Sequence, residues 1–227
     1  MQINVYGCLF SLGGMISYQL FKHLTFNKIN MSINDFNYIF IILVIVCIFG
    51  GRLMKYMKGY FSFERFPQIY KGGLVSYGAL YMGLLYLWLI ARIYNVDKLL
   101  LIEAAAVSSS LQHIMIRAGN YFNNELKGKY TDFLNRRYPI HLQRIITEGF
   151  IMGSIAWWYI DTIGEGYIYL IYANLYPLVR IFNEIFTEDD NVMPIWYKKY
   201  FYKYISYPNF QAVCLCLVSN LFYLVLI

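Results

Sequence analysis

Seven long apolar segments run through this chain, at about residues 3–21, 36–53, 74–94, 99–116, 145–160, 167–186 and 210–227. A helix that crosses the hydrocarbon core of a bilayer needs about 20 mostly apolar residues. Backbone groups inside a bilayer must find hydrogen-bond partners within the protein, which favours helices over open strands. The pattern therefore predicts an all-α integral membrane protein with seven transmembrane helices, folded as a single domain over residues 1–227.

The composition excludes a soluble globular enzyme and a disordered tail. Apolar residues make up 59% of the chain and charged residues only 14%, whereas about 25% of a typical soluble domain is charged. The formal net charge of +6 indicates contact with anionic membrane lipid, and no nucleic-acid partner is expected. The four cysteines all stand inside apolar segments without metal-binding or redox spacing, so no metal site is expected.

Charged side chains stand within or beside the apolar segments, at Arg52, Glu103, Arg117, Glu125, Glu148, Arg180 and Glu184. A lone charge at the centre of a bilayer costs at least a few kcal/mol, so such groups pair or line a wet cavity. One interpretation is mutual pairing of Arg180 with Glu184, or of Arg117 with Glu125, which would hold helices together. The other is a central cavity in which arginines bind the phosphate of an anionic lipid, because guanidinium donates two parallel hydrogen bonds.

The run RAGNYFNNELKG at residues 117–128 closely resembles the signature R-x-G-N-F-x-N-x-E-x-x-G of bacterial prolipoprotein diacylglyceryl transferases. Tyr121 stands where that family has phenylalanine. Further blocks follow in the family's order: Tyr6-Gly7, Gly50-Gly51-Arg52, Gly72-Gly73 through Gly78, Tyr138-Pro139, and Tyr176 through Arg180 to Glu184. The resemblance covers nearly the whole chain.

This resemblance implies a fold with seven transmembrane helices in the bacterial inner (cytoplasmic) membrane. It implies an enzyme that transfers the diacylglyceryl group of phosphatidylglycerol to the thiol of a lipobox cysteine in a preprolipoprotein. The reaction forms a thioether, releases glycerol phosphate and uses no cofactor. Its partners would be phosphatidylglycerol and the lipobox-containing preprolipoprotein or another thiol acceptor.

The resemblance also assigns expected roles to individual residues. Arg117 and Arg180 would hold the phosphate. The residues expected to bind or surround the substrate are Tyr6, Arg52, Asn120, Asn123, Glu125, Gly128, Tyr176 and Glu184.

Two departures from the family concern residues near the expected site. The family has a histidine, the usual candidate for activating the thiol, where this chain has Tyr77. Either Tyr77 serves as the base, or His113, four residues before Arg117, replaces the missing imidazole. The family block Q-L-Y-E after the proline is also altered, because here Leu142 is followed by Gln143 and Arg144.

Two further departures concern the acceptor and the orientation. Only residues 129–137 separate Gly128 from Tyr138, where the family inserts a much longer head domain that is thought to guide the protein substrate. Lysine and arginine gather on the side of the motif, which favours a cytoplasmic site by the positive-inside rule, whereas the family's site faces outward. A divergent transferase with another acceptor and a non-catalytic lipid-binding homologue therefore remain alternatives.

Overall fold

The computed structural model describes residues 5–29, 31–57, 76–124, 127–188 and 206–227. Each of the seven apolar segments is helical within these ranges. The single helices are α1 (Val5–Thr25), α2 (Ile33–Met57), α3 (Ser76–Tyr94), α4 (Lys98–Phe122), α7 (Tyr167–Ile185) and α9 (Tyr207–Leu226). The fifth segment is composite, with α5 (Ile140–Arg144), a π-helical stretch (Ile145–Ile151) and α6 (Met152–Trp158) in succession.

The predicted class, an all-α integral membrane protein, is confirmed. Within the part of the chain that the structure describes, four stretches are long and apolar enough to cross a membrane, namely Ile33–Met54, Tyr77–Tyr94, Lys98–Phe122 and Tyr207–Leu226. They belong to α2, α3, α4 and α9. Crossing by α1, by the composite fifth segment and by α7 stays a prediction.

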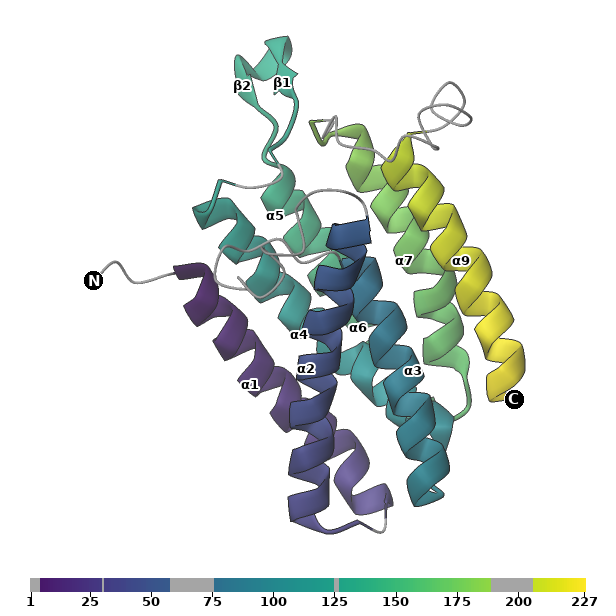
Figure 1. Cartoon of the computed structure of the whole chain (residues 1–227). Coiled ribbons are helices and arrows are strands. Elements are labelled where there is room, and N and C mark those ends of the chain that lie inside the picture. Colours follow the sequence, from purple (N-terminus) through teal and green to yellow (C-terminus); the bar gives the residue numbers. More distant parts are fainter. Residues whose placement is uncertain (1–4, 30, 58–75, 125–126, 189–205) are drawn as a thin grey trace.

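The helices form one bundle in which α1 packs on α4, α2 on α3, and α7 on α9. Successive helices run in opposite directions, so the ends of α2, α4 and α7 lie with the starts of α3, α5 and α9 (Figure 1). A small antiparallel hairpin, β1 (Tyr130–Thr131) and β2 (Arg136–Arg137), projects from this same end of the bundle. We call it the hairpin end.

The crossing of α2 and α3 depends on two glycines. A Cβ atom on Gly50 would strike the backbone carbonyl of Gly78, and a Cβ atom on Gly78 would strike that of Gly50. Small residues of this kind let two helix backbones approach closely inside a membrane. The glycine pair therefore fixes how the end of α2 meets the start of α3.

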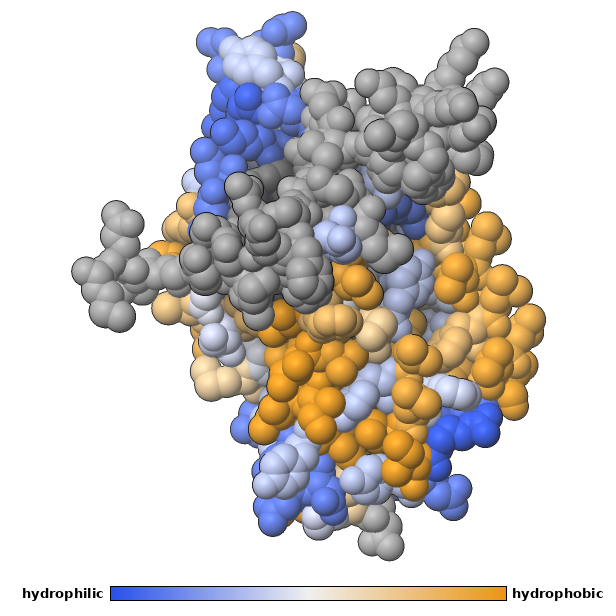
Figure 2. All heavy atoms as spheres, in the orientation of Figure 1, coloured by the Kyte–Doolittle hydropathy of each residue, from blue (hydrophilic) through white to orange (hydrophobic). Residues whose placement is uncertain are grey.

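The outer surface of the bundle is apolar. Large apolar side chains on α2 and α9 are exposed, among them Ile41, Ile45, Leu217, Leu221 and Leu224. Figure 2 shows apolar residues over much of the visible face, with hydrophilic residues on the hairpin and at the opposite end of the bundle. Such a broad exposed apolar surface fits a lipid environment rather than water.

Candidate active site

The topology brings the sequence-predicted residues to one end of the molecule. Arg52, Arg117 and Arg180 stand near the ends of α2, α4 and α7, and Tyr77 stands near the start of α3. All four helix ends lie at the hairpin end (Figure 1). Residues far apart in the chain can therefore act together there.

Glu148 is the centre of this arrangement. Its carboxylate is completely buried and its Oε2 accepts hydrogen bonds from Arg117, at 2.8 Å from Nε and 2.6 Å from Nη2. Its Oε1 accepts from Arg180 Nη1 at 3.3 Å and from Asn183 Nδ2 at 3.1 Å. Two arginines from two separate helices thus converge on a single carboxylate.

Local backbone features place Glu148 where the arginines can reach it. It lies inside the π-helical stretch Ile145–Ile151, a type of helix irregularity that is frequent at functional sites. The next residue is Gly149, and a Cβ atom there would clash with the side chain of Ile114 on α4. The glycine therefore allows the π-helical stretch to lie directly against α4, within reach of Arg117.

Arg144 is a third buried guanidinium in the same cluster. Its side chain is 1% exposed, and its Nη2 donates to Thr187 Oγ1 at 2.7 Å and to Glu184 Oε2 at 3.4 Å. Its Nε lies 4.0 Å from Glu148 Oε1, which is an ion pair but too long for a hydrogen bond. We refer to Arg117, Arg144, Arg180, Glu148 and Glu184 as the ion cluster.

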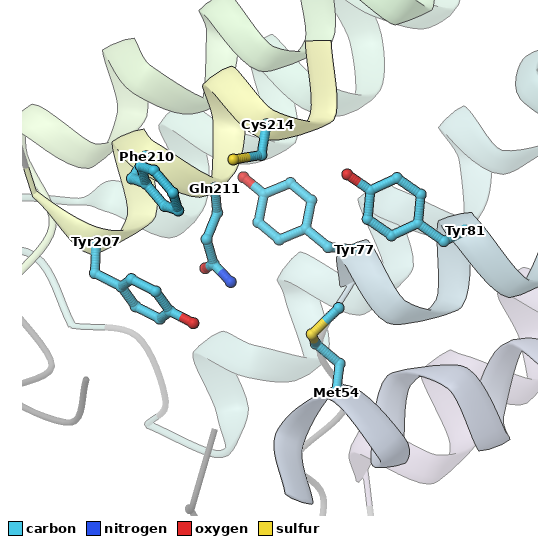
Figure 3. A pocket seen from close by; sticks show the side chains of 7 residues that line it. All are labelled: Met54, Tyr77, Tyr81, Tyr207, Phe210, Gln211 and Cys214. Carbon is cyan, nitrogen blue, oxygen red and sulfur yellow. The ribbon is translucent and has the colours of Figure 1, made fainter. Parts of the chain in front are cut away.

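A cavity opens beside the ion cluster, between α2, α3 and α9. Its volume is about 150 Å³, and its lining residues are Met54, Tyr77, Tyr81, Tyr207, Phe210, Gln211 and Cys214. Figure 3 shows Tyr77 and Tyr81 pointing from α3 toward α9. The guanidinium carbon of Arg180 lies 5.7 Å from the centroid of the Tyr77 ring, a cation–π distance. Tyr77 therefore links the cavity to the ion cluster, whereas neither Arg117 nor Arg180 lines this cavity.

His113 and Tyr176 face each other between α4 and α7. Their ring centroids are 5.5 Å apart. Among the described residues, His113 Nδ1 and the hydroxyls of Tyr176 and Tyr77 are buried without a hydrogen-bond partner. Unpartnered buried polar atoms are uncommon in proteins and are costly. These three groups are therefore candidates to contact a polar ligand beside the ion cluster.

The other sequence-predicted residues surround this site. Tyr6 packs its ring against Gly119, where a Cβ atom would lie 2.6 Å from Tyr6 Cδ2. Asn120 and Arg52 are buried, and Asn123 is exposed at the end of α4.

The loop residues of the signature are only partly described. Gly128 forms an isolated β-bridge with Thr187, the residue that accepts from Arg144. Glu125 lies outside the described residues, as does the block Gly72-Gly73. The pairing of Arg117 with Glu125 therefore stays a hypothesis.

The sequence analysis placed Glu148 and Arg144 among the departures and the buried charges, but not in the site. The structure corrects this, because Glu148 is the partner of both Arg117 and Arg180, and Glu184 forms an ion pair with Arg144. One signal was available: Arg144, just before the fifth apolar segment, and Glu148 inside it stand four apart, a spacing that places two side chains on one helix face.

Comparison with known proteins agrees with this arrangement. The sequence profile of the prolipoprotein diacylglyceryl transferases matches residues 1–226. A phosphatidylglycerol–prolipoprotein diacylglyceryl transferase of Caldanaerobacter subterraneus subsp. tengcongensis is 28% identical over 203 residues, which cover 86% of this chain and 77% of that protein. The protein of the same name from Thermoanaerobacter sp. is 29% identical over 177 residues, with 74% and 68% covered. That of Acaryochloris marina is 27% identical over 211 residues, with 82% and 76% covered. The chain belongs to the prolipoprotein diacylglyceryl transferase family.

Proposed function

We propose that this protein transfers the diacylglyceryl group of phosphatidylglycerol to the cysteine thiol of a prolipoprotein. The observation that carries the proposal is the convergence of Arg117 on α4 and Arg180 on α7 within one buried cluster beside a cavity. Family membership and the names of the relatives support the same donor and acceptor. The protein would act as a multi-pass protein of the bacterial cytoplasmic membrane, with seven helices crossing it.

The reaction requires one bond to form and one to break. The thiol loses its proton to a base. The thiolate sulfur then attacks the carbon of the diacylglyceryl group that bears the phosphate ester. The bond between that carbon and the phosphate oxygen breaks, with its electron pair passing to the oxygen. The phosphodiester monoanion becomes glycerol phosphate, which carries a second negative charge. Guanidinium groups in a water-poor site stabilise that developing charge.

The roles that we propose for the residues rest on the family resemblance and on where the residues lie. Arg117 and Arg180 would contact the phosphate, and the remaining signature residues would shape the pocket. Tyr77 is our candidate base and would accept the thiol proton on its oxygen in the phenolate form, because its ring lies between the cavity and the Arg180 guanidinium. His113 is the alternative, because its buried Nδ1 has no partner among the described residues.

The test is a transfer assay with the purified full-length chain. Protein, phosphatidylglycerol and a lipobox peptide should yield a thioether-linked diacylglyceryl peptide, detected by mass spectrometry. Arg117→Lys and Arg180→Lys should each lower the rate about a hundredfold or more, as loss of a transition-state donor does elsewhere. Arg92→Gln is the matched control, because Arg92 is exposed in the last turn of α3 and contacts the Trp88 ring. Lipid binding without any product would indicate a non-catalytic lipid-binding protein.

One observation favours a second candidate, a transferase with a different thiol acceptor. The segment between Gly128 and Tyr138 is a hairpin of two two-residue strands, which offers little surface for a protein substrate. The same assay with a small-molecule thiol in place of the peptide separates the two candidates. Transfer to the small thiol alone would support the second.

A further inference from the structure

Arg144 has hydrogen-bonding capacity that the described residues around it do not use. Its side chain is 1% exposed, so bulk water does not reach it as it would a surface arginine. Nη2 is occupied by Thr187 and Glu184. Nε and both hydrogens of Nη1 have no hydrogen-bond partner among the described residues. Leaving a buried charged donor unsatisfied is expensive, so the guanidinium is arranged for an acceptor.

Glu148 does not supply that acceptor. Both of its oxygens already accept hydrogen bonds, Oε2 from Arg117 and Oε1 from Arg180 and Asn183. The nearest approach of Arg144 to this carboxylate is the 4.0 Å between Nε and Oε1.

The charges of the ion cluster indicate that the acceptor for Arg144 is negatively charged. Its described members are three guanidiniums and two carboxylates, all at most 12% exposed. Among the described residues that form these ion pairs, three positive and two negative charges leave one positive charge in excess. Buried charges are tolerated when they are neutralised, and a phosphodiester carries the single negative charge that would balance the cluster.

We propose that Arg144 is a third phosphate-binding residue, whose free N–H groups donate to phosphate oxygens in the ion cluster. The identification of the phosphate as that of the lipid donor rests on the proposed function. The same chemistry would also suit a free phosphate ion.

The experiment measures binding apart from turnover. The full chain, purified in a neutral detergent, is titrated by calorimetry with short-chain phosphatidylglycerol and, separately, with inorganic phosphate. Arg144→Gln removes the charge, whereas Arg144→Lys keeps the charge but loses the planar set of donors. We expect Arg144→Gln to bind the lipid about tenfold more weakly or worse, since hydrogen bonds to charged groups account for such factors. Arg144→Lys should lose less affinity, and the exposed Arg92→Gln should bind as the unaltered protein does.

Each outcome decides the proposal. Unchanged lipid affinity in a folded Arg144→Gln variant overturns it, and if that variant fails to fold, unchanged affinity in Arg144→Lys overturns it equally. Arg144-dependent binding of inorganic phosphate without binding of the lipid overturns the lipid as the source. Lipid binding that depends on Arg144, with no thioether product from the unaltered protein, supports this site while contradicting the proposed transfer. Transfer that proceeds equally well in Arg144→Gln, with an unchanged KM for the lipid, refutes this site and leaves the transfer standing.

Discussion

Arg117 holds one oxygen of Glu148 with two of its guanidinium nitrogens, Nε at 2.8 Å and Nη2 at 2.6 Å. The two residues come from α4 and from the π-helical stretch, separated by 31 positions in the chain. Both are buried. A short charge-assisted contact of this kind fixes the orientation of the guanidinium before any substrate arrives.

Replacing Glu148 by glutamine should destabilise the protein by about 3–5 kcal/mol, because it leaves buried guanidiniums without their shared counter-charge. The free energy of unfolding in detergent measures this. Glu188→Gln is the control, since Glu188 pairs with Arg137 at 2.6 Å with both side chains about half exposed, and exposed pairs contribute only about 0–1 kcal/mol. Equal losses of unfolding free energy in the two variants would show that the buried ion cluster stabilises the protein no more than an exposed ion pair does.

Gly149→Ala should lower both stability and transfer activity. The new methyl group meets Ile114 Cγ1 on α4, and overpacking of this kind typically costs about 1–3 kcal/mol. A second substitution, Ile114→Ala, should restore part of the loss, because it removes the Cγ1 atom that the new methyl group meets. Gly14→Ala on α1 is the control, because the nearest described atom to a Cβ there is Gln112 Oε1, at an ordinary contact distance of 3.8 Å. No rescue by Ile114→Ala would mean that the clash is elsewhere.

Tyr77→Phe should lower the transfer rate about a hundredfold or more while preserving lipid affinity, because it removes a proton acceptor but keeps the ring beneath Arg180. The measurement is the single-turnover rate set beside the calorimetric affinity. His113→Gln should reduce the rate less. The assignment of the base moves to His113 if Tyr77→Phe stays fully active and His113→Gln is inactive.

Glu103 is expected to matter for folding but not for the reaction. Its carboxylate accepts from the backbone N–H of Gly164 at 2.6 Å and of Tyr169 at 2.8 Å, which fastens the start of α7 to α4 at the end opposite the hairpin. Glu103→Gln should cost about 1–3 kcal/mol of unfolding free energy, whereas the exposed Glu165→Gln should be neutral. A change in lipid affinity on Glu103→Gln would contradict a purely structural role.

The sequence predicted the helices well because apolar length is a local property. The segment at 36–53 falls within α2, and the segment at 167–186 differs from α7 by a single residue at its end. The arginines of the signature were also identified in advance, since Arg117 and Arg180 belong to motifs with fixed spacing. The spacing of residues along the chain cannot show which side chain on another helix forms the ion pair.

Glu148 and Arg144 illustrate that limit. The sequence analysis weighed Glu184 and Glu125 as ion-pair partners because they stand near the arginines in the chain. The structure instead uses Glu148, 31 positions from Arg117 and 32 from Arg180. Which carboxylate reaches which guanidinium depends on how α4, α7 and the π-helical stretch pack, and on the glycine that lets them approach.

The deep burial of the ion cluster has a consequence for how the protein responds to its surroundings. Dissolved salt weakens interactions between exposed charges separated by more than about 8 Å at physiological ionic strength, but has little effect on charges that it cannot approach. Capture of the lipid should therefore vary little with the salt concentration of the medium. The hairpin is different, because Arg136 and Arg137 are exposed to the medium. Binding of an anionic partner to these two arginines should therefore weaken as ionic strength rises.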